Sequence, residues 1–550
     1  MEKIKRYLLL IIFFILFFQS AKNCSAQSLV EEPSVLARVE IVGKINQLNL
    51  PIYAQLRDGS GKDYVLVVAP ESQLKKAGVR YRILDQEAKS KDYLVASGRA
   101  KDRQQATQIS QVVYDDGQQL VIRASPEETE GVIDSGLDVQ RLEEAPMVLS
   151  LPEAVYFSVP YDSKIAEMMG KVSQTDLSNL LGNLSGENQV SIGGSDYLIS
   201  TRYTSSGTPI SKATQYAYEY LRAQGLTVSY QGWSTDYYSN QNVIGVKTGV
   251  IYPQEIILVT AHLDDRPSSG AAPGADDNAS GSVAAMAMAK ILGQYRFSRT
   301  IRFVLFTGEE QGLLGSQAYA SKVLRDNDNI IAVYNLDMIA YDNSNGPVLE
   351  LHTRTDSTLG QEGDLRIANT FLDVVNTYSL ADRLSPVIFK DGLSRGDHGS
   401  FWNKGYSAIL AVENYQADFN PEYHQSTDRR SLLNMDYFTD FIKGSLGTVA
   451  HLAQYYQGLT PTPTSKPTNT PTPKISTPTP RPPTSTPIPT ATPTPNCWLG
   501  DANKDGKTDL ADFKFILTHY LETSLACADQ NRDSKINGID FGQVLLYLLK

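Results

Sequence analysis

The sequence predicts an α/β protein whose largest domain has a mostly parallel central sheet flanked by helices. The first observation is that apolar runs rich in Ile, Val and Leu, at residues 256–260, 300–306 and 331–336, alternate with helical patterns at 282–292 and 315–323. Parallel strands have this continuous apolar character because helices cover both of their faces. The second observation is that each apolar run ends in side chains that can bind a metal ion.

The overall composition limits the class of protein. A chain of 550 residues with 41% hydrophobic residues can form several cores, so we expect two to four domains. The net charge of −11 argues against a general nucleic-acid-binding protein, which needs a basic face. Three cysteines are too few for a fold that depends on a disulfide framework.

Residues 1–26 have the pattern of a signal peptide. Lys3, Lys5 and Arg6 precede an apolar run at 7–18, and small residues follow near Ala26. The run is shorter than the roughly 20 residues that a membrane-spanning helix needs. An uncleaved anchor is the alternative. We expect a secreted, extracellular protein with no membrane span after signal cleavage.

Residues 27–150 predict a small N-terminal α+β domain with an internal repeat. Segments 64–84 and 119–142 both show a strand, a Pro-Glu pair that opens a short helix, a glycine and a second strand. The region contains no histidine or cysteine, so a catalytic metal site is not expected there. A propeptide or an inhibitory domain is one interpretation, and a passive accessory domain is the other.

Residues 459–496 form a linker rich in Thr and Pro. Alternating Thr-Pro sequence favours extended polyproline geometry and cannot fill a core. This segment is predicted to be a spacer between the catalytic domain, residues 159–458, and the C-terminal module, residues 497–550.

The C-terminal module contains two loops in which Asp and Asn alternate. Oxygen ligands at alternating positions surround one hard cation, and repetition of the pattern argues against an accidental acidic turn. The expected calcium ligands are Asp501, Asn503, Asp505, Asp509 and Asp512 in the first loop, and Asp529, Asn531, Asp533, Asn537 and Asp540 in the second. Each loop leads into an apolar helix, so the module is expected to be all-α.

This module resembles a type I dockerin over essentially its whole length. The resemblance implies two calcium ions and docking to a cohesin module of a scaffold or cell-surface protein, as in a cellulosome. Cys497 and Cys527 each precede a calcium loop. They could pair as a disulfide or remain as two thiols.

The metal-capable side chains of the central stretch predict a two-metal hydrolase. They follow the strand runs in order: His262 and Asp264, then Asp277, then Glu309-Glu310, then Asp337. Strand ends of an α/β sheet bring such side chains to one crevice. Two metal ions need a shared carboxylate, and a neighbouring glutamate can act as general base. Each motif alone has an ordinary explanation, such as a helix cap or a solvent-exposed pair of glutamates. The combination of all the motifs in this order does not.

The same motifs resemble those of the dizinc aminopeptidases of the bacterial leucyl aminopeptidase family, whose relatives include glutamate carboxypeptidase, glutaminyl cyclase and the transferrin receptor. The matching motifs are AHLDD, PGADDNASG, TGEEQGLLGS, NLDMI, GDHGSFWNKGYSAI and YHQSTD, and the likeness covers residues 163–456. It implies a phosphorylase/hydrolase-like fold, peptide substrates and two zinc ions. The implied zinc ligands are His262, Asp277, Glu310, Asp337 and His424.

The resemblance also implies roles for the other motif residues. Asp277 would bridge the two ions, and Glu309 would be the general base. Asp264 would fix the ring of His262 from behind. Tyr423 is the candidate donor to the oxyanion. Further residues with implied roles are Arg395, as a substrate contact, Asp397, as a support of the site, and Asp276, as a structural residue.

Three functional hypotheses remain open from the sequence. The first is an aminopeptidase that removes residues from the free N-terminus of peptides. The second is a relative with glutaminyl cyclase or carboxypeptidase activity, because pocket loops set the specificity on this fold. The third is a non-catalytic peptidase-like binding domain, which predicts missing ligands, whereas all five ligands and the base are present.

Overall fold

The computed structural model describes residues 32–41, 45–98, 100–149, 159–343, 346–356 and 358–457. The expected signal peptide, the Thr/Pro linker, the calcium-loop residues and the cysteine pair lie outside the described residues. No helix within the described ranges combines the length and apolar character that a bilayer crossing requires.

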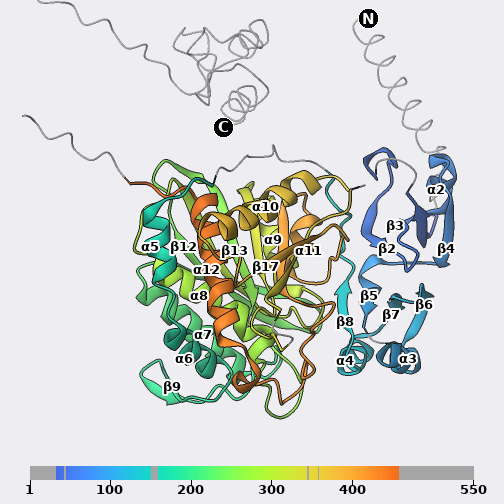
Figure 1. Ribbon diagram of the computed structural model, residues 1–550. Helices are drawn as coiled ribbons and strands as arrows, with labels where there is room; N and C mark the ends of the chain where they lie inside the picture. The colour runs from blue at the N-terminus through green and yellow to red at the C-terminus, as the bar shows by residue number, and fades with distance from the viewer. Residues whose placement is uncertain are drawn as a thin grey trace, which may run out of the picture. The chain divides into compact units, whose positions relative to one another are not determined.

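The N-terminal region, residues 32–149, consists of two four-stranded antiparallel sheets of the same topology (Figure 1, blue). The first has the order β2-β3-β1-β4 and the second the order β6-β7-β5-β8. Their strands are β1 (Ser34–Glu40), β2 (Ile52–Arg57), β3 (Asp63–Pro70), β4 (Tyr81–Asp85), β5 (Tyr93–Ser97), β6 (Gln111–Asp115), β7 (Gln119–Arg123) and β8 (Asp138–Arg141).

A short helix precedes the last strand of each sheet, as the sequence repeat predicts. Helix α2 (Glu71–Ala77) ends at Gly78, which has the left-handed conformation that glycine tolerates. Helix α4 (Pro126–Asp134) begins with a capping box between Ser125 and Glu128. The second sheet also carries α3 (Ala100–Ile109), where the first has only a 3-10 turn at Ile45–Gln47. The sequence repeat is therefore a repeat of structure.

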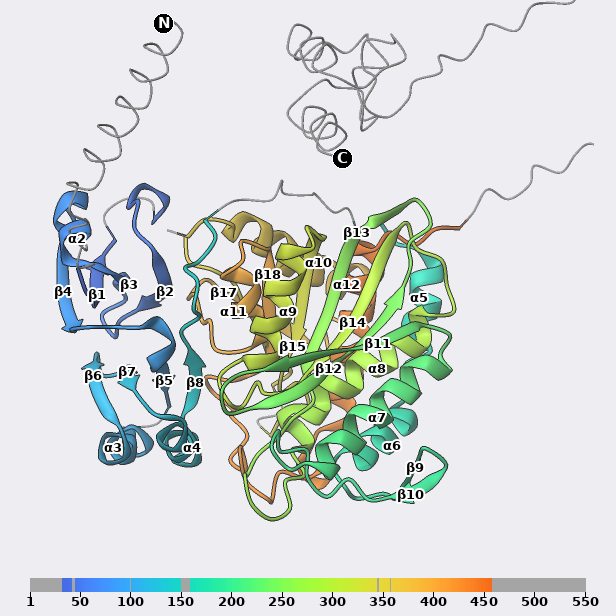
Figure 2. The same cartoon turned by 180° about the vertical axis from the view of Figure 1, so that it is seen from behind.

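The larger part of the chain is built on an eight-stranded mixed sheet with the order β11-β12-β14-β13-β15-β18-β16-β17 (Figure 2). Its central strands β14, β13, β15 and β18 are parallel, while β11, β12 and the β16-β17 pair join them in antiparallel contacts. The strands are β11 (Thr227–Ser234), β12 (Ser239–Lys247), β13 (Tyr252–His262), β14 (Arg299–Phe306), β15 (Asn329–Leu336), β16 (Val348–His352), β17 (Ser385–Phe389) and β18 (Ala408–Glu413). The expected parallel arrangement thus holds among the four central strands, and β16 and β17 are parallel to each other but join the centre in an antiparallel contact.

Helices cover both faces of this sheet, and each face has its own core. The larger core includes side chains of α5 (Ser163–Gly170), α6 (Gln174–Leu184), α7 (Thr208–Ala223), α8 (Gly281–Leu292), α10 (Gln361–Thr377) and α12 (Met435–Leu452). The smaller core is formed under α9 (Leu314–Arg325) and α11 (Asp397–Trp402). A short hairpin, β9 (Val190–Ile192) and β10 (Ser195–Tyr197), follows α6.

Candidate active site

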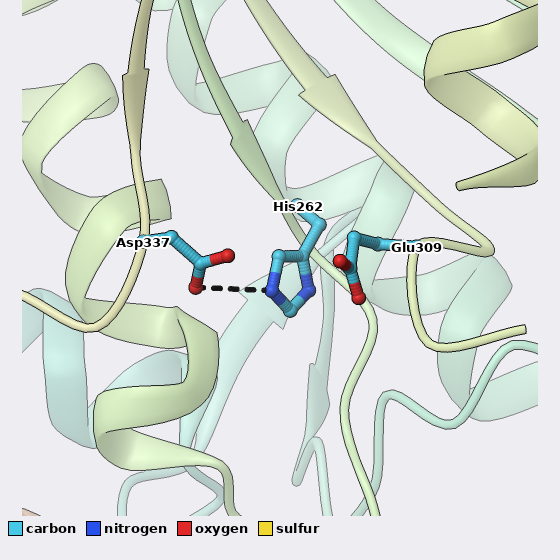
Figure 3. A group of neighbouring side chains, drawn as sticks. All are labelled: His262, Glu309 and Asp337. Atoms are coloured by element: carbon cyan, nitrogen blue, oxygen red, sulfur yellow. Dashed lines mark hydrogen bonds and ion pairs between the residues drawn. The ribbon is translucent and has the colours of Figure 1, made fainter. Parts of the chain in front are cut away.

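The carboxyl ends of three adjacent parallel strands bring the sequence motifs together. His262 is the last residue of β13, Asp337 directly follows β15, and Glu309 and Glu310 follow β14. Ligand sites in α/β sheets form at this edge. Figure 3 shows Asp337 and Glu309 next to the imidazole of His262, and donor atoms of these three residues lie within 4.8 Å of one another.

Asp277 connects this group to a second one. Its Oδ1 lies 3.3 Å from Nε2 of His262, and its Oδ2 lies 3.2 Å from Nε2 of His424. Asp337 Oδ1 is 3.3 Å from the same nitrogen of His262, and Glu310 Oε2 is 3.0 Å from that of His424. The site therefore has two halves, each with one imidazole and one further acid, that share the carboxylate of Asp277.

The backbone around Asp277 is held by two residues that lie in the quoted motifs but were given no role there, Asp428 and Gly281. The carboxylate of Asp428 accepts hydrogen bonds of 3.0 Å from the backbone N–H groups of Asp276 and Asp277. Gly281, at the start of α8, lies so close to the end of β15 that a Cβ there would be 2.4 Å from the carbonyl oxygen of Leu336. This close approach sets Asp277 beside Asp337.

The donor set fits zinc. Two imidazole nitrogens with three carboxylates match the ligands that zinc takes in proteins. Glu310 is buried, and its Oε1 has no hydrogen-bond partner within the described ranges. A buried carboxylate oxygen without a partner is costly unless a cation neutralises it.

The charges of the site act strongly on one another. Burial alone would raise the pKa of Asp277, but hydrogen bonds from His262 and His424 hold it below its usual range. Burial opposes the protonation of His424, yet Glu310 and Asp277 raise the pKa of this histidine to about 10. Burial raises the pKa of Glu309 well above its usual range, and nearby acids add to this effect.

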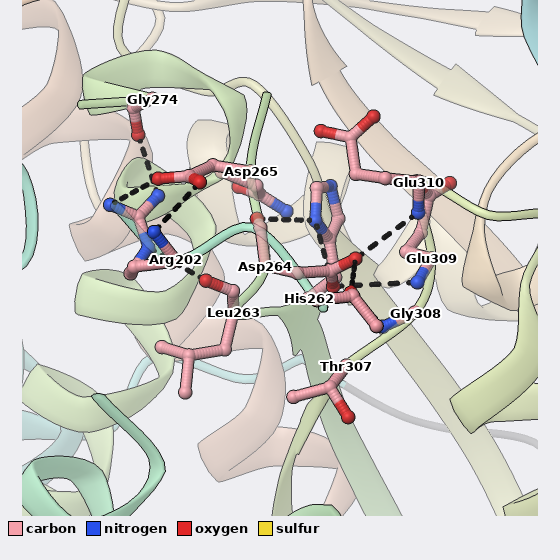
Figure 4. A network of polar contacts seen from close by, with 12 residues as sticks. Arg202, His262, Leu263, Asp264, Asp265, Gly274, Thr307, Gly308, Glu309 and Glu310 are labelled. Carbon is pink, nitrogen blue, oxygen red and sulfur yellow. Dashed lines mark hydrogen bonds and ion pairs between the residues drawn. The ribbon is translucent and has the colours of Figure 1, made fainter. Parts of the chain in front are cut away.

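Asp264 supports both His262 and the glutamate pair, although not in the expected way. The atom of Asp264 nearest to Nδ1 of His262 is its backbone carbonyl oxygen, at 3.2 Å, whereas its carboxylate is 3.7 Å away. The carboxylate instead accepts weak hydrogen bonds from the backbone N–H groups of Glu309, at 3.4 Å, and Glu310, at 3.3 Å (Figure 4). It also accepts a 2.8 Å bond from Thr204. Asp264 therefore positions the segment that carries both glutamates.

The loop after His262 is fixed by a buried arginine. Arg202 pairs with Asp265 at 3.1 Å and donates to the carbonyl oxygens of Leu184, Leu263, Pro273 and Gly274. Figure 4 shows this arginine beside the network of Asp264. Its donors connect the loop after His262 to the segment that precedes Asp277.

The remaining predicted residues lie at or near the site. The ring of Tyr423 stacks on the imidazole of His424 with 3.7 Å between centroids. Asp397 is fully buried, and burial raises its pKa to about 7. Asp276 accepts a 3.1 Å hydrogen bond from the backbone N–H of Ala340.

Arg395 lies next to an acid from the N-terminal region. Its Nη1 is 3.0 Å from Oδ2 of Asp138, and Oδ1 of the same aspartate accepts a 2.6 Å hydrogen bond from Tyr423. Sequence reasoning missed Asp138. The one available signal was a departure within the repeat, since Asp138 stands where the first copy has Arg80.

A histidine outside the site, which the sequence left without a role, also has acid partners. His352 on β16 lies between Glu350, at 3.0 Å, and Asp391, at 2.9 Å.

Metal-binding side chains at the carboxyl edge of a parallel sheet, with a half-buried glutamate beside them, define a metal-dependent hydrolase. Comparison with known proteins agrees. Residues 242–448 match the model of peptidase family M28. A probable leucine aminopeptidase of Arthroderma otae is 30% identical over 292 residues, which is 50% of this chain and 74% of that protein. A probable leucine aminopeptidase of Trichophyton verrucosum is 28% identical, with 50% of this chain and 75% of that protein covered.

Solved structures share the fold. The LapA aminopeptidase of Legionella pneumophila superposes with a TM-score of 0.51 at 20% identity, covering 66% of this chain and 98% of that one. LapB from the same organism superposes with a TM-score of 0.51 at 17% identity, and the match covers 66% of this chain and 99% of that one. The chain belongs to peptidase family M28. It is a zinc metallopeptidase, a hydrolase.

Proposed function

We propose that this metallopeptidase is an aminopeptidase with a pair of zinc ions at one site. The observation that carries the proposal is the position of Asp277, whose two carboxylate oxygens face His262 and His424 separately. One carboxylate between two imidazoles is the arrangement that two neighbouring cations need. The leucine aminopeptidase names of the relatives support the choice of aminopeptidase.

His262 and Asp337 would hold one ion, His424 and Glu310 the other, and Asp277 both. Zinc bound there supplies positive charge that polarises a peptide carbonyl and lowers the pKa of water. Glu309 is half-buried beside His262 and is not needed as a ligand, so we assign it the general base. It takes a proton from the attacking water and passes it to the leaving amine.

Tyr423 is the hydrogen-bond donor that we assign to the developing oxyanion. Its stacking on His424 holds the hydroxyl next to one half of the site. The buried carboxylate of Asp264 keeps the Glu309-Glu310 segment in place during the reaction.

The test is Glu309→Gln, which keeps the shape of the side chain and removes the base. We expect hydrolysis of aminoacyl p-nitroanilides to fall by at least about 1,000-fold, at the middle of the range for a catalytic acid-base group. Zinc content should stay at two ions per chain by elemental analysis. Glu167→Gln, on the exposed face of α5 where Glu167 pairs with Lys164, is the matched control. Full activity in the Glu309 variant, or activity in the presence of a strong zinc chelator, would refute the proposal.

A substrate panel separates the aminopeptidase from the related activities. Peptides with a free N-terminus should be cleaved, whereas N-acetylated peptides should not. Cyclisation of N-terminal glutamine would indicate a glutaminyl cyclase, and cleavage of N-acetylated peptides at their C-terminus would indicate a carboxypeptidase.

We also propose, from the sequence patterns alone, that the protein is secreted and attached by a dockerin to a cohesin-bearing partner. The two loops with alternating Asp and Asn at 501–512 and 529–540 support this proposal. Calorimetric titration of the zinc-loaded full chain with calcium should give two sites, and Asp505→Ala should remove one of them. A chain that binds no calcium would refute it.

A further inference from the structure

The N-terminal region is anchored on the peptidase part around the active site. Glu143 pairs with Lys404 at 2.5 Å in a largely buried contact. Elsewhere, Glu130 accepts a 2.6 Å hydrogen bond from Tyr238 and lies 3.3 Å from Arg266. In the sequence, Glu130 precedes and Glu143 follows the turn between α4 and β8. Residues at the end of this turn line the cavity of the metal site.

Asp138, the first residue of β8, places its carboxylate among three side chains of the peptidase part. Tyr423 donates to Oδ1 at 2.6 Å, and Arg395 pairs with Oδ2 at 3.0 Å. The hydroxyl of Tyr415 lies 3.4 Å from Oδ2. The carboxylate of Asp138 therefore occupies the hydrogen-bonding capacity of the tyrosine that stacks on His424.

The charge of Arg395 shows that this position suits a carboxylate. Its side chain is 18% exposed, and within the described ranges Asp138 is the only acid at ion-pair distance. Arg395 also donates to Ser97 of the N-terminal region, and its Nε is buried with no hydrogen-bond partner among the residues that the structure describes. A guanidinium that is largely buried needs a counter-charge. Among the described residues, the peptidase part has no acid at contact distance from Arg395, so the counter-charge comes from the N-terminal region or from a ligand.

Two cavities meet at Asp138. The inner cavity, lined by the zinc-binding side chains, has a volume of about 60 Å³, and the outer one has about 520 Å³. Four residues line both, namely Asp138, Arg395, Tyr415 and Tyr423. Sites for small molecules usually measure about 300–1,000 Å³, so the inner cavity can hold a few water molecules but no peptide. Asp138 and its three partners therefore separate the metal site from the outer cavity.

We propose that the N-terminal region holds the enzyme closed, with the carboxylate of Asp138 bound to Arg395, Tyr415 and Tyr423, and that Arg395 and Tyr415 form a subsite that accepts a substrate carboxylate once Asp138 leaves. This inference rests on the proposed peptidase site and adds an internal inhibitor and a substrate class to it. The substrate carboxylate is either the C-terminus of a short peptide or an acidic side chain. Departure of Asp138 also frees the hydroxyl of Tyr423 for the oxyanion.

The first experiment compares full-length Asp138→Asn and Asp138→Ala with the wild type on a neutral aminoacyl p-nitroanilide. An internal competitor lowers the fraction of enzyme that can bind substrate, which raises KM and leaves kcat unchanged. We expect KM to fall at least tenfold in both variants at unchanged kcat. Asp115→Asn is the matched control, because Asp115 pairs with Arg103 inside the N-terminal region. It should keep the wild-type KM.

A second measurement does not depend on activity. The rate at which a chelator removes zinc from the loaded full chain should rise at least tenfold in Asp138→Ala and not in Asp115→Asn. Wild-type values of KM and of this rate in both Asp138 variants would overturn the inference while leaving the proposed function intact. Absence of hydrolysis in every protein would overturn the proposed function and this inference with it.

The subsite is tested in the Asp138→Ala chain with paired substrates. Leu-Gly against Leu-Gly-amide reports on a C-terminal carboxylate, and Leu-Glu-amide against Leu-Gln-amide reports on an acidic side chain. We expect kcat/KM to favour the acid at least tenfold in one pair, and Arg395→Gln in the same background to abolish that preference. No preference in either pair would overturn the assignment of the subsite.

Discussion

His352 makes a strong prediction about the stability of the fold. It is fully buried on β16, with Nε2 3.0 Å from Glu350 and Nδ1 2.9 Å from Asp391. Burial alone would lower its pKa, but hydrogen bonds to Asp391 and Glu350 raise the pKa to about 9, from an ordinary value of 6.5. Since one pKa unit corresponds to about 1.36 kcal/mol, the protonated imidazole stabilises the folded state by roughly 3 kcal/mol.

The sign of the pH dependence follows from the direction of this shift. The folded pKa is higher than the unfolded one, so the stabilisation is complete below pH 6.5 and is lost as the pH rises towards 9. His352→Gln removes the titrating group. Between pH 6 and pH 9.5 the wild type should therefore lose roughly 3 kcal/mol more unfolding free energy than the variant.

Two measurements check this value. Urea unfolding of both proteins at pH 6 and pH 9.5 gives the difference directly, and the variant cancels the contribution of the groups that do not contact His352. NMR of histidine-labelled protein should show an imidazole that titrates near pH 9 and disappears in His352→Gln. An imidazole that titrates below pH 7, or two proteins whose stabilities change in parallel with pH, would refute the reasoning.

Two further substitutions test how Asp277 is held. Asp428→Ala leaves the buried N–H groups of Asp276 and Asp277 without an acceptor, so zinc affinity, measured by chelator competition, should fall about 10–100-fold; unchanged affinity would contradict this support. Gly281→Ala places a Cβ 2.4 Å from Leu336 O, which should lower the melting temperature by several degrees and reduce kcat/KM; a protein with wild-type values of both would show that α8 need not lie so close to β15.

The site residues could be predicted because their positions follow from local sequence and sheet order. Asp337 directly follows an apolar run, and parallel neighbours place such residues at one edge. The role of His424 in the second half of the site could be predicted only from the family resemblance. Its own sequence context gives no signal, because His424 lies beyond β18 in a loop without a strand pattern. The contact of Asp138 could not be predicted, because it depends on how the surfaces of two regions far apart in the sequence meet.

The boundary between α5 and α6 is a second feature that could not be predicted from the sequence. Residues 163–181 predict one helix, but the structure has α5 and α6, with a break after Gly170. Ser173 caps the second helix by accepting a hydrogen bond from the N–H of Asp176. Apolar periodicity continues across the break because both helices pack on the same core, so periodicity alone could not reveal it. The carboxylate partners of His352 escaped prediction because Asp391 follows a different strand.

The order of the chain determines when each part of the site exists during synthesis. His262, Asp277 and Glu310 emerge from the ribosome long before His424 and Asp428, so an incomplete chain has acids at the sheet edge without the second imidazole. The N-terminal region with Asp138 is already made by then, and domains generally fold in order from the N-terminus. The inhibitor that we propose would therefore be folded before the last ligand is synthesised, and a newly made chain would have no interval in which a finished catalytic site stands uncovered.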